Sequence, residues 1–164
     1  MLDKTRVSLT EAMRRFAMSI SIISTSDDKG QHYAMTATAV VSVSLNPESM
    51  LVCVNKNTLF SSVATGADKF AVNLLASDQI SQSKDCAGGL PQDSRVNNKE
   101  WEVHDTGVAI LKGAQTHILC RKSKMFEYGT HTILIGDVYN ILVNKTIDTL
   151  IYMDGKYGKF KELK

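Results

Sequence analysis

Two threonines alternate with two alanines at Thr36-Ala37-Thr38-Ala39, in a stretch that has the composition of a β-strand. Alternate side chains of a strand point to opposite faces, which predicts Thr36 and Thr38 on one face and the alanines on the other. Small side chains let a flat ring approach the backbone, and hydroxyl and N–H groups can bond its carbonyls and nitrogens. A plain structural strand can have the same composition, so both interpretations stay open here.

A second group of polar residues lies between residues 55 and 62, where a strand is expected to pass into a short helix. A helix N-terminus presents unpaired N–H groups and partial positive charge, which favours a phosphate. Asn57 is the expected N-cap of a helix over 57–65, and capping alone accounts for at most one of the polar residues. The residues that could bind hydroxyls or a phosphate of a ligand are Asn55, Asn57, Thr58, Ser61 and Ser62.

His131 follows the glycine turn at Gly129 and stands at the start of an expected strand. A lone histidine is more often structural or exposed than catalytic, and no second histidine lies near it in the sequence. Tyr152 and Tyr157 flank a turn close to the C-terminus. Their rings could stack on a nicotinamide or adenine ring, or could belong to a terminal strand that packs on the rest of the protein.

These residues must be positioned by many short strands, because β-branched and apolar segments recur between turn signals. Strands are expected over 19–25, 31–44, 50–54, 70–75, 109–117, 118–122, 132–143 and 150–153. Helices are expected over 57–65 and 77–87, and a first one is expected to begin at a capping box at Ser8 and to pack its apolar face on the core. Residues 90–104 are expected to form a loop with a helical turn near Trp101. Without a βαβ repeat or a G-x-G-x-x-G motif, the pattern favours an antiparallel barrel with short helices.

The composition fits a single globular domain over residues 1–164, with 43% hydrophobic and 22% charged residues. A net charge of +2 is too balanced for a nucleic-acid-binding protein. The first residues contain no apolar segment, so we expect no signal peptide, and no apolar run approaches the ~20 residues that a membrane span needs. Three widely spaced cysteines predict no disulfide framework or zinc site and suit the cytoplasm. The basic C-terminal run 156–164 is expected to be solvated.

Taken in order, several segments resemble one family, the short flavin reductases that serve two-component flavin-dependent monooxygenases. The 4-hydroxyphenylacetate monooxygenase reductases are among them. The resemblance spans residues 10–158 and rests more on the order and spacing of the segments than on any one of them. The segments are 36–48, 51–55, 70–75, 111–114, 129–133, 136–138, 150–152 and 155–157.

The resemblance implies a mainly β protein, an antiparallel FMN-binding split barrel, and a homodimer with the flavin near the subunit interface. The ring of FMN or FAD would lie beside Thr36, Ala37, Thr38, Ala39, Val40 and Ser42, with Cys53, Val54 and Asn55 continuing that wall. Thr58, Ser61, Ser62, Ser83 and Lys84 would approach the ribityl chain or the phosphate. His131, the expected catalytic residue, would lie beside the nicotinamide of NADH or NADPH, and Tyr152 and Tyr157 would cover the site.

The implied reaction is hydride transfer from reduced nicotinamide to the flavin, in which the protein supplies binding and orientation. The reduced flavin could diffuse to a partner monooxygenase, or could stay bound and reduce other acceptors. Two further readings are a flavin-binding electron carrier and a pyridoxamine-phosphate-oxidase-like barrel, although the latter relies on more Arg and Lys around the phosphate than residues 55–62 offer. Cys86, the bulky segment 31–34 and Lys156 depart from the family pattern, which leaves the flavin and the nicotinamide cofactor open.

Overall fold

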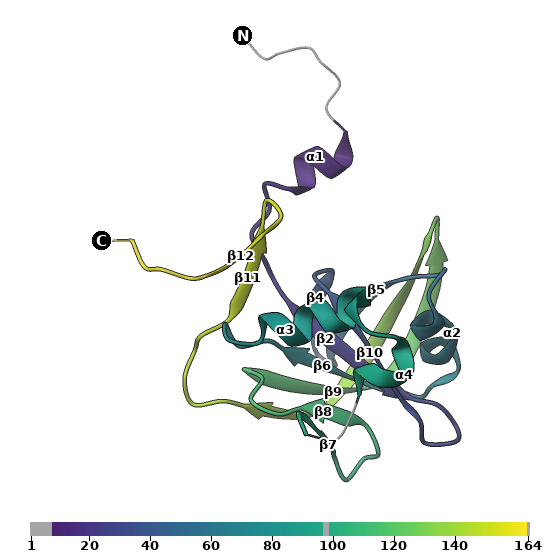
Figure 1. Cartoon of the computed structure of the whole chain (residues 1–164). Coiled ribbons are helices and arrows are strands. Elements are labelled where there is room, and N and C mark those ends of the chain that lie inside the picture. Colours follow the sequence, from purple (N-terminus) through teal and green to yellow (C-terminus); the bar gives the residue numbers. More distant parts are fainter. Residues whose placement is uncertain (1–7, 97–98, 164) are drawn as a thin grey trace.

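The computed structural model describes residues 8–96 and 99–163 and is mainly antiparallel β (Figure 1). Residues 1–7, on which the expectation of no signal peptide partly rests, lie outside the described residues. None of the described helices is long and apolar enough to cross a membrane. The predicted class, strands with short helices, is confirmed.

The barrel is a strongly curved sheet of seven antiparallel strands in the order β3-β2-β6-β9-β10-β5-β4. Its two longest strands, β9 and β10, pair along most of their length around a turn at Gly129. The bounds are β2 Ser21–Ser26, β3 His32–Ala37, β4 Val40–Leu45, β5 Glu48–Asn55, β6 Lys69–Leu74, β9 Thr116–Tyr128 and β10 His131–Val143.

The core lies inside this curved sheet and under the helix α2 (Leu59–Gly66). Val52 and Val54 of β5 point into it, and Cys53 between them faces the other side, as strand alternation requires. Phe60 of α2 is 1% exposed and closes the core against Phe70 and Leu134. Gly136 makes room for that packing, because a side chain there would lie 2.6 Å from the ring of Phe70.

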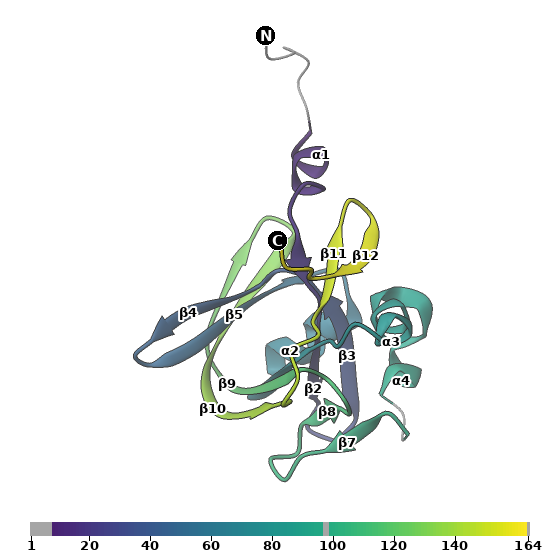
Figure 2. The ribbon, with the colours of Figure 1, turned by 90° about the vertical axis from the view of Figure 1, so that its left-hand side faces the viewer.

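Two smaller sheets and a helical segment complete the fold (Figure 2). The strands β1 (Met18–Ser19), β11 (Leu150–Met153) and β12 (Lys156–Lys159) form one sheet, and β7 (Trp101–Val103) pairs with β8 (Ala109–Leu111). The helical segment runs through α3 (Ile80–Lys84), η1 (Asp85–Gly89) and α4 (Gln92–Arg95). It packs on β3, where Gln92 and Arg95 both donate to the backbone oxygen of Ala34.

The first helix is where the sequence-based expectation was wrong. Ser8 caps α1 (Leu9–Met13) by accepting from the backbone N–H of Glu11, as predicted. The helix is shorter than expected, however, and it packs on no core: Leu9 is 76% exposed and Phe16 is 63% exposed. Both ribbon views place α1 away from the barrel (Figures 1 and 2), so its apolar face has no covering element within the described chain.

Three other expectations need correction. The predicted strand over 31–44 is two strands, because the chain bends at Thr38. The helical turn in the 90–104 segment is α4, and Trp101 instead begins β7. The strands expected over 109–117 and 118–122 are β8 and the much longer β9. The basic tail is mostly exposed, as expected, although its first residues form the strand β12.

A fully buried amide, Asn73 on β6, connects four strands around it. Its Nδ2 donates to the Ile22 oxygen at 2.9 Å and to Ser24 Oγ at 3.0 Å. Its Oδ1 accepts from the Leu111 N–H at 3.0 Å and lies 2.9 Å from His117 Nδ1. Because Oδ1 is only an acceptor, Nδ1 is the protonated nitrogen of a neutral His117.

This arrangement predicts an acid-sensitive stability. Burial lowers the pKa of His117 below its ordinary value of 6.5, and the nearby His104 adds to this, although Glu102 opposes it. The unfolded chain therefore takes up a proton that the folded chain resists as pH falls below 6.5. The stabilisation is fully present above pH 6.5 and is lost progressively below it, toward the lowered pKa of the folded state.

We expect the melting temperature of the wild type to fall more between pH 7 and pH 5.5 than that of His117→Gln. Glutamine has no titratable group, whereas an ordinary histidine has a pKa of about 6.5. His104→Gln is the matched control, and it should retain most of the acid sensitivity. Equal pH profiles for the wild type and His117→Gln would contradict the assignment.

Candidate functional site

The Thr36–Val40 segment turns from β3 into β4 and leaves backbone groups near the surface. Strand alternation holds only as far as Ala37, which is buried in the core. At the bend, the Val40 N–H bonds the Thr38 oxygen, and the Cys53 N–H bonds the Ala39 oxygen at 3.1 Å. Thr38 therefore does not continue the face of Thr36, and the exposed Ala39 presents no side chain bulkier than a methyl group.

The junction between β5 and α2 is a polar turn that the side chains themselves build. Asn55 Oδ1 accepts from the Asn57 N–H at 2.9 Å, and the Asn55 oxygen accepts from Thr58 Oγ1. Thr58 is the N-cap, since its backbone is extended and its Oγ1 accepts from the Ser61 N–H at 3.2 Å. The predicted cap Asn57 is wrong because the Asn55 side chain already holds it in the preceding turn.

The predicted residues of this junction differ in accessibility. Thr58 and Ser62 are exposed, whereas Ser61 is 5% exposed. Val54 is buried in the core, so only its backbone could meet a ligand, while Cys53 and Asn55 face the opposite side. Val40 is partly buried against the core, and Ser42 is exposed on β4.

His131 begins β10 and lies directly opposite Asn55 in the antiparallel pairing. Opposed residues project to the same face of a sheet, so these two side chains and the next pair, Cys53 and Ile133, form a row there. His131 is exposed, and its Nδ1 lies 2.9 Å from Thr130 Oγ1, which leaves Nε2 available to a ligand.

A second group of predicted residues comes from three elements distant in sequence. Thr36 Oγ1 donates to the Ser83 oxygen at 2.7 Å, and the buried Ser83 hydroxyl lies 3.2 Å from Tyr157 Oη. Lys84 Nζ lies 5.8 Å above the Tyr157 ring, which packs edge-on against Tyr152 with centroids 5.3 Å apart. The structure therefore joins β3, α3 and the β11–β12 hairpin at one place.

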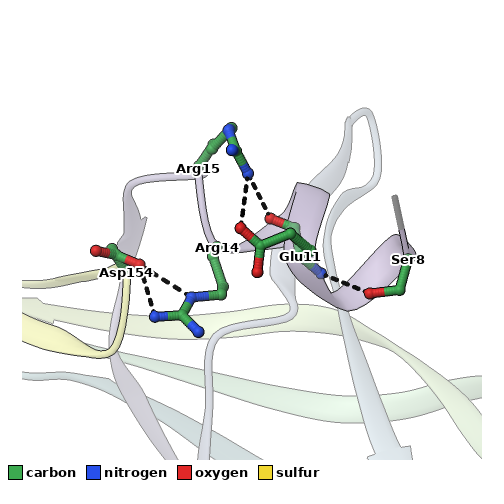
Figure 3. A network of polar contacts seen from close by, with 5 residues as sticks. All are labelled: Ser8, Glu11, Arg14, Arg15 and Asp154. Carbon is green, nitrogen blue, oxygen red and sulfur yellow. Dashed lines mark hydrogen bonds and ion pairs between the residues drawn. The ribbon is translucent and has the colours of Figure 1, made fainter. Parts of the chain in front are cut away.

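The hairpin is also held by a contact between Arg14 and Asp154, which no sequence pattern predicted (Figure 3). Two nitrogens of Arg14 lie 2.9 Å from Asp154 Oδ1, and the Asp154 N–H donates to the Arg14 oxygen at 3.0 Å. Asp154 occupies the tip of the hairpin with a φ of 52°, followed by Gly155 at 75°. Arg14 and Tyr157 thus hold the hairpin from its two sides.

A cavity of about 570 Å³ lies elsewhere, at the C-terminal end of α2. Of the predicted residues, only Ser62 lines it. Its other lining includes Asp27, Asp28 and Asp68 with a single lysine, Lys69, so its charge disfavours a phosphate.

The two buried thiols, on η1 and β9, are not reactive nucleophiles. Burial raises the pKa of both Cys86 and Cys120 to about 12, so they stay protonated at neutral pH. All three cysteines are free. Within residues 8–96 and 99–163, histidine, cysteine and acidic side chains form no group of three that could hold a metal ion.

Comparisons with known proteins agree with this architecture. Residues 13–161 match the flavin reductase like domain family. The reductase component of an FADH(2)-dependent resorcinol hydroxylase from Rhizobium sp. is 39% identical over 147 residues, which cover 88% of this chain and 82% of that protein. An FMN reductase (NADH) from Stutzerimonas stutzeri is 33% identical over 152 residues, which cover 93% of this chain and 87% of that protein.

The solved structure of the flavin reductase PheA2 superimposes with a TM-score of 0.82 at 32% identity, and the match covers 92% of this chain and 95% of that one. The predicted fold, a split barrel, is confirmed by this likeness. With most of its length matched by the family and by these relatives, the chain belongs to the flavin reductase like domain family.

Proposed function

We propose that the protein is an NAD(P)H:flavin oxidoreductase that transfers a hydride from reduced nicotinamide to FMN or FAD and supplies the reduced flavin to a partner monooxygenase. The observation that carries this function is the position of the Thr36–Val40 segment. It runs between the Asn55–His131 row and the Ser83–Lys84–Tyr157 group, and its Ala39 oxygen binds the neighbouring strand β5. The named relatives support the same activity.

The residues fit a flavin. Ala39 is exposed and small enough for a flat ring to reach the backbone, and the turn at Asn55 and Thr58 supplies polar groups beside it. The eight-residue α2 presents at its N-terminus the N–H groups that the Thr58 cap does not bind, and Lys84 supplies a cation. The full set proposed for the flavin is Thr36, Ala37, Thr38, Ala39, Val40, Ser42, Cys53, Val54, Asn55, Thr58, Ser61, Ser62, Ser83 and Lys84, with Tyr152 and Tyr157 as the cover.

When bound, the flavin supplies the hydride-accepting chemistry, so the chain's own residues need only bind, orient and exclude water. Holding two rings at reacting distance can lower a barrier by roughly 7–11 kcal/mol in the best cases. His131 Nε2 would hold the nicotinamide carboxamide, while the Ser83–Tyr157 contact would fix the opposite end of the site.

The deciding experiment is a titration of the purified chain with NADH or NADPH in the presence of FMN, FAD or riboflavin, followed by loss of the reduced nicotinamide absorbance. We expect turnover with at least one flavin. A yellow protein that keeps its flavin on dialysis would favour a reductase whose flavin stays bound and reduces other acceptors. A protein that binds flavin but oxidises neither NADH nor NADPH would instead be a flavin-binding electron carrier.

The Ser83–Tyr157 contact gives a sharper test of the site. Tyr157→Phe removes the hydroxyl beside the buried Ser83 and keeps the ring beneath Lys84. Loss of one such hydrogen bond costs about 0.5–1.5 kcal/mol, so we expect flavin affinity to fall roughly three- to tenfold. Quenching of flavin fluorescence measures it, with Tyr139→Phe as the matched control. Unchanged affinity would place this pair outside the flavin site.

We also propose a homodimer formed by one such domain per chain, residues 1–164, in the cytoplasm, where three free thiols are stable. The support is an apolar surface that one chain leaves uncovered along β4 and the ends of β9 and β10. Its residues include Val41, Val43, Leu45, Phe126, Ile141 and Val143, and Leu45 is 86% exposed. Light scattering should give twice the 18.1 kDa of one chain, and Leu45→Asp should lower that mass.

A further inference from the structure

A cavity of about 410 Å³ lies between the β11–β12 hairpin and the chain that follows it. Its floor is apolar and includes Ala17, Ile151 and Met153, and Phe160 stands beside it with 76% of its surface exposed. Gly158 opens the floor further, because a side chain there would meet no atom within 4 Å. The space is large enough for a planar aromatic base.

The cavity is positively charged. Lys156, Lys159 and Lys161 line it, and none of them has an ion-pair partner among the described residues. Its one acidic residue, Asp154, is neutralised by Arg14 at 2.9 Å. An apolar floor under three ammonium groups suits a ligand that joins an aromatic ring to phosphates.

The cavity is joined to the proposed flavin site around the edge of the hairpin. The pairing places Tyr152 and Tyr157 on one face of the hairpin and Met153 with Lys156 on the other. The first face meets Ser83 and Lys84 through Tyr157, and the second supplies the apolar floor of the cavity and Lys156. Tyr157 and Lys159 belong to the first face and line the cavity at the edge strand β12. β12 is the edge strand of its sheet (Figure 2), so a ligand can pass around it from Lys84 to the three lysines.

We infer that this cavity binds the adenosine-phosphate half of a dinucleotide whose flavin or nicotinamide ring lies on the other side of β12. The inference rests on the proposed function and adds a substrate class to it. FAD and NAD(P)H both contain this half, and FMN lacks it. The lysines would meet the phosphates, and the adenine would lie over Ile151 and Met153 against Phe160.

Two variants of the full chain remove different features of the cavity. Lys156→Ala/Lys159→Ala removes two charges, and Gly158→Leu fills the floor with no change of charge. Lys29→Ala/Lys145→Ala is the matched control, since both of its lysines are exposed and lie outside the cavity. Lys156→Arg/Lys159→Arg should restore binding. Thermal melts check that each variant is folded.

Calorimetry gives the affinities for FAD, FMN and NADH separately, so that the inference is tested even if turnover is absent. Removing two exposed charge contacts should lower the affinity for the adenylate-bearing ligand roughly two- to thirtyfold. FMN affinity should stay within about twofold, and added salt should weaken only the former.

The three separately measured affinities show which dinucleotide occupies the cavity. A loss confined to FAD identifies the flavin dinucleotide as the occupant, and a loss confined to NADH identifies the nicotinamide dinucleotide. Equal losses for FAD and FMN, or no loss for any ligand in both cavity variants, would overturn the inference. Absence of NAD(P)H oxidation in the wild type would instead count against the proposed function.

Discussion

Replacing His131 by alanine should reduce the kcat/KM for NAD(P)H oxidation by about 100-fold, the lower end of what a positioned histidine contributes. The same change should leave the flavin affinity within about twofold, because no flavin contact of the proposed site depends on this side chain. The physical reason is its location. His131 is exposed at the start of β10, opposite Asn55, with Nδ1 held by Thr130 and Nε2 free to meet a second ligand.

The comparison with other variants separates hydrogen bonding from bulk. His131→Gln keeps a donor at nearly the same reach and should recover part of the activity. His104→Ala is the matched control, since His104 lies in the turn after β7 and bonds Thr106 and Asn140. Turnover of His131→Ala equal to that of the wild type would remove this residue from the site, whatever the flavin affinity.

The strands were predictable where local pattern decides the structure. The β-branched run before Asp27 and the apolar runs of β5 and β6 depend on neighbouring residues, and each of these segments ends at a polar or glycine-containing turn. The boundaries that failed depend on partners far away in sequence. β9 continues to Tyr128 because β10 pairs with it along its whole length, and Trp101 joins a strand because β8 lies beside it. The apolar periodicity near the N-terminus correctly predicted the helix α1, but this pattern does not identify the surface that would cover its apolar face.

The candidate site was predictable as residue types rather than as geometry. Thr36, Ser83 and Tyr157 could be proposed from their segments, yet their contacts cross 47 and 74 residues of sequence. The clamp between Arg14 and Asp154 spans 140 residues and had no signal at all, because single charged residues near both termini are ordinary. The proposed residues also form two groups, the Asn55–His131 row and the Ser83–Lys84–Tyr157 group, and the distance between these groups depends on the three-dimensional fold.

Asn73→Leu is expected to cause the largest loss of stability among the changes considered. The amide is 0% exposed and joins β2, β6, β8 and β9 through four contacts. Leucine has a similar size but leaves the Leu111 N–H and the His117 ring without their acceptor. A buried polar group that loses its partner costs about 1–3 kcal/mol, so the sum is roughly 3–5 kcal/mol.

A loss of that size is a large part of the roughly 5–15 kcal/mol that holds a domain together. It should appear as a lower midpoint of urea unfolding, with the slope of the transition unchanged. Asn144→Ala, at an exposed position after β10, should shift the midpoint very little. Because His117 would lose its bond to Asn73, the acid sensitivity of the wild type should also change in Asn73→Leu. A midpoint equal to that of the wild type would show that the strands hold together without this amide.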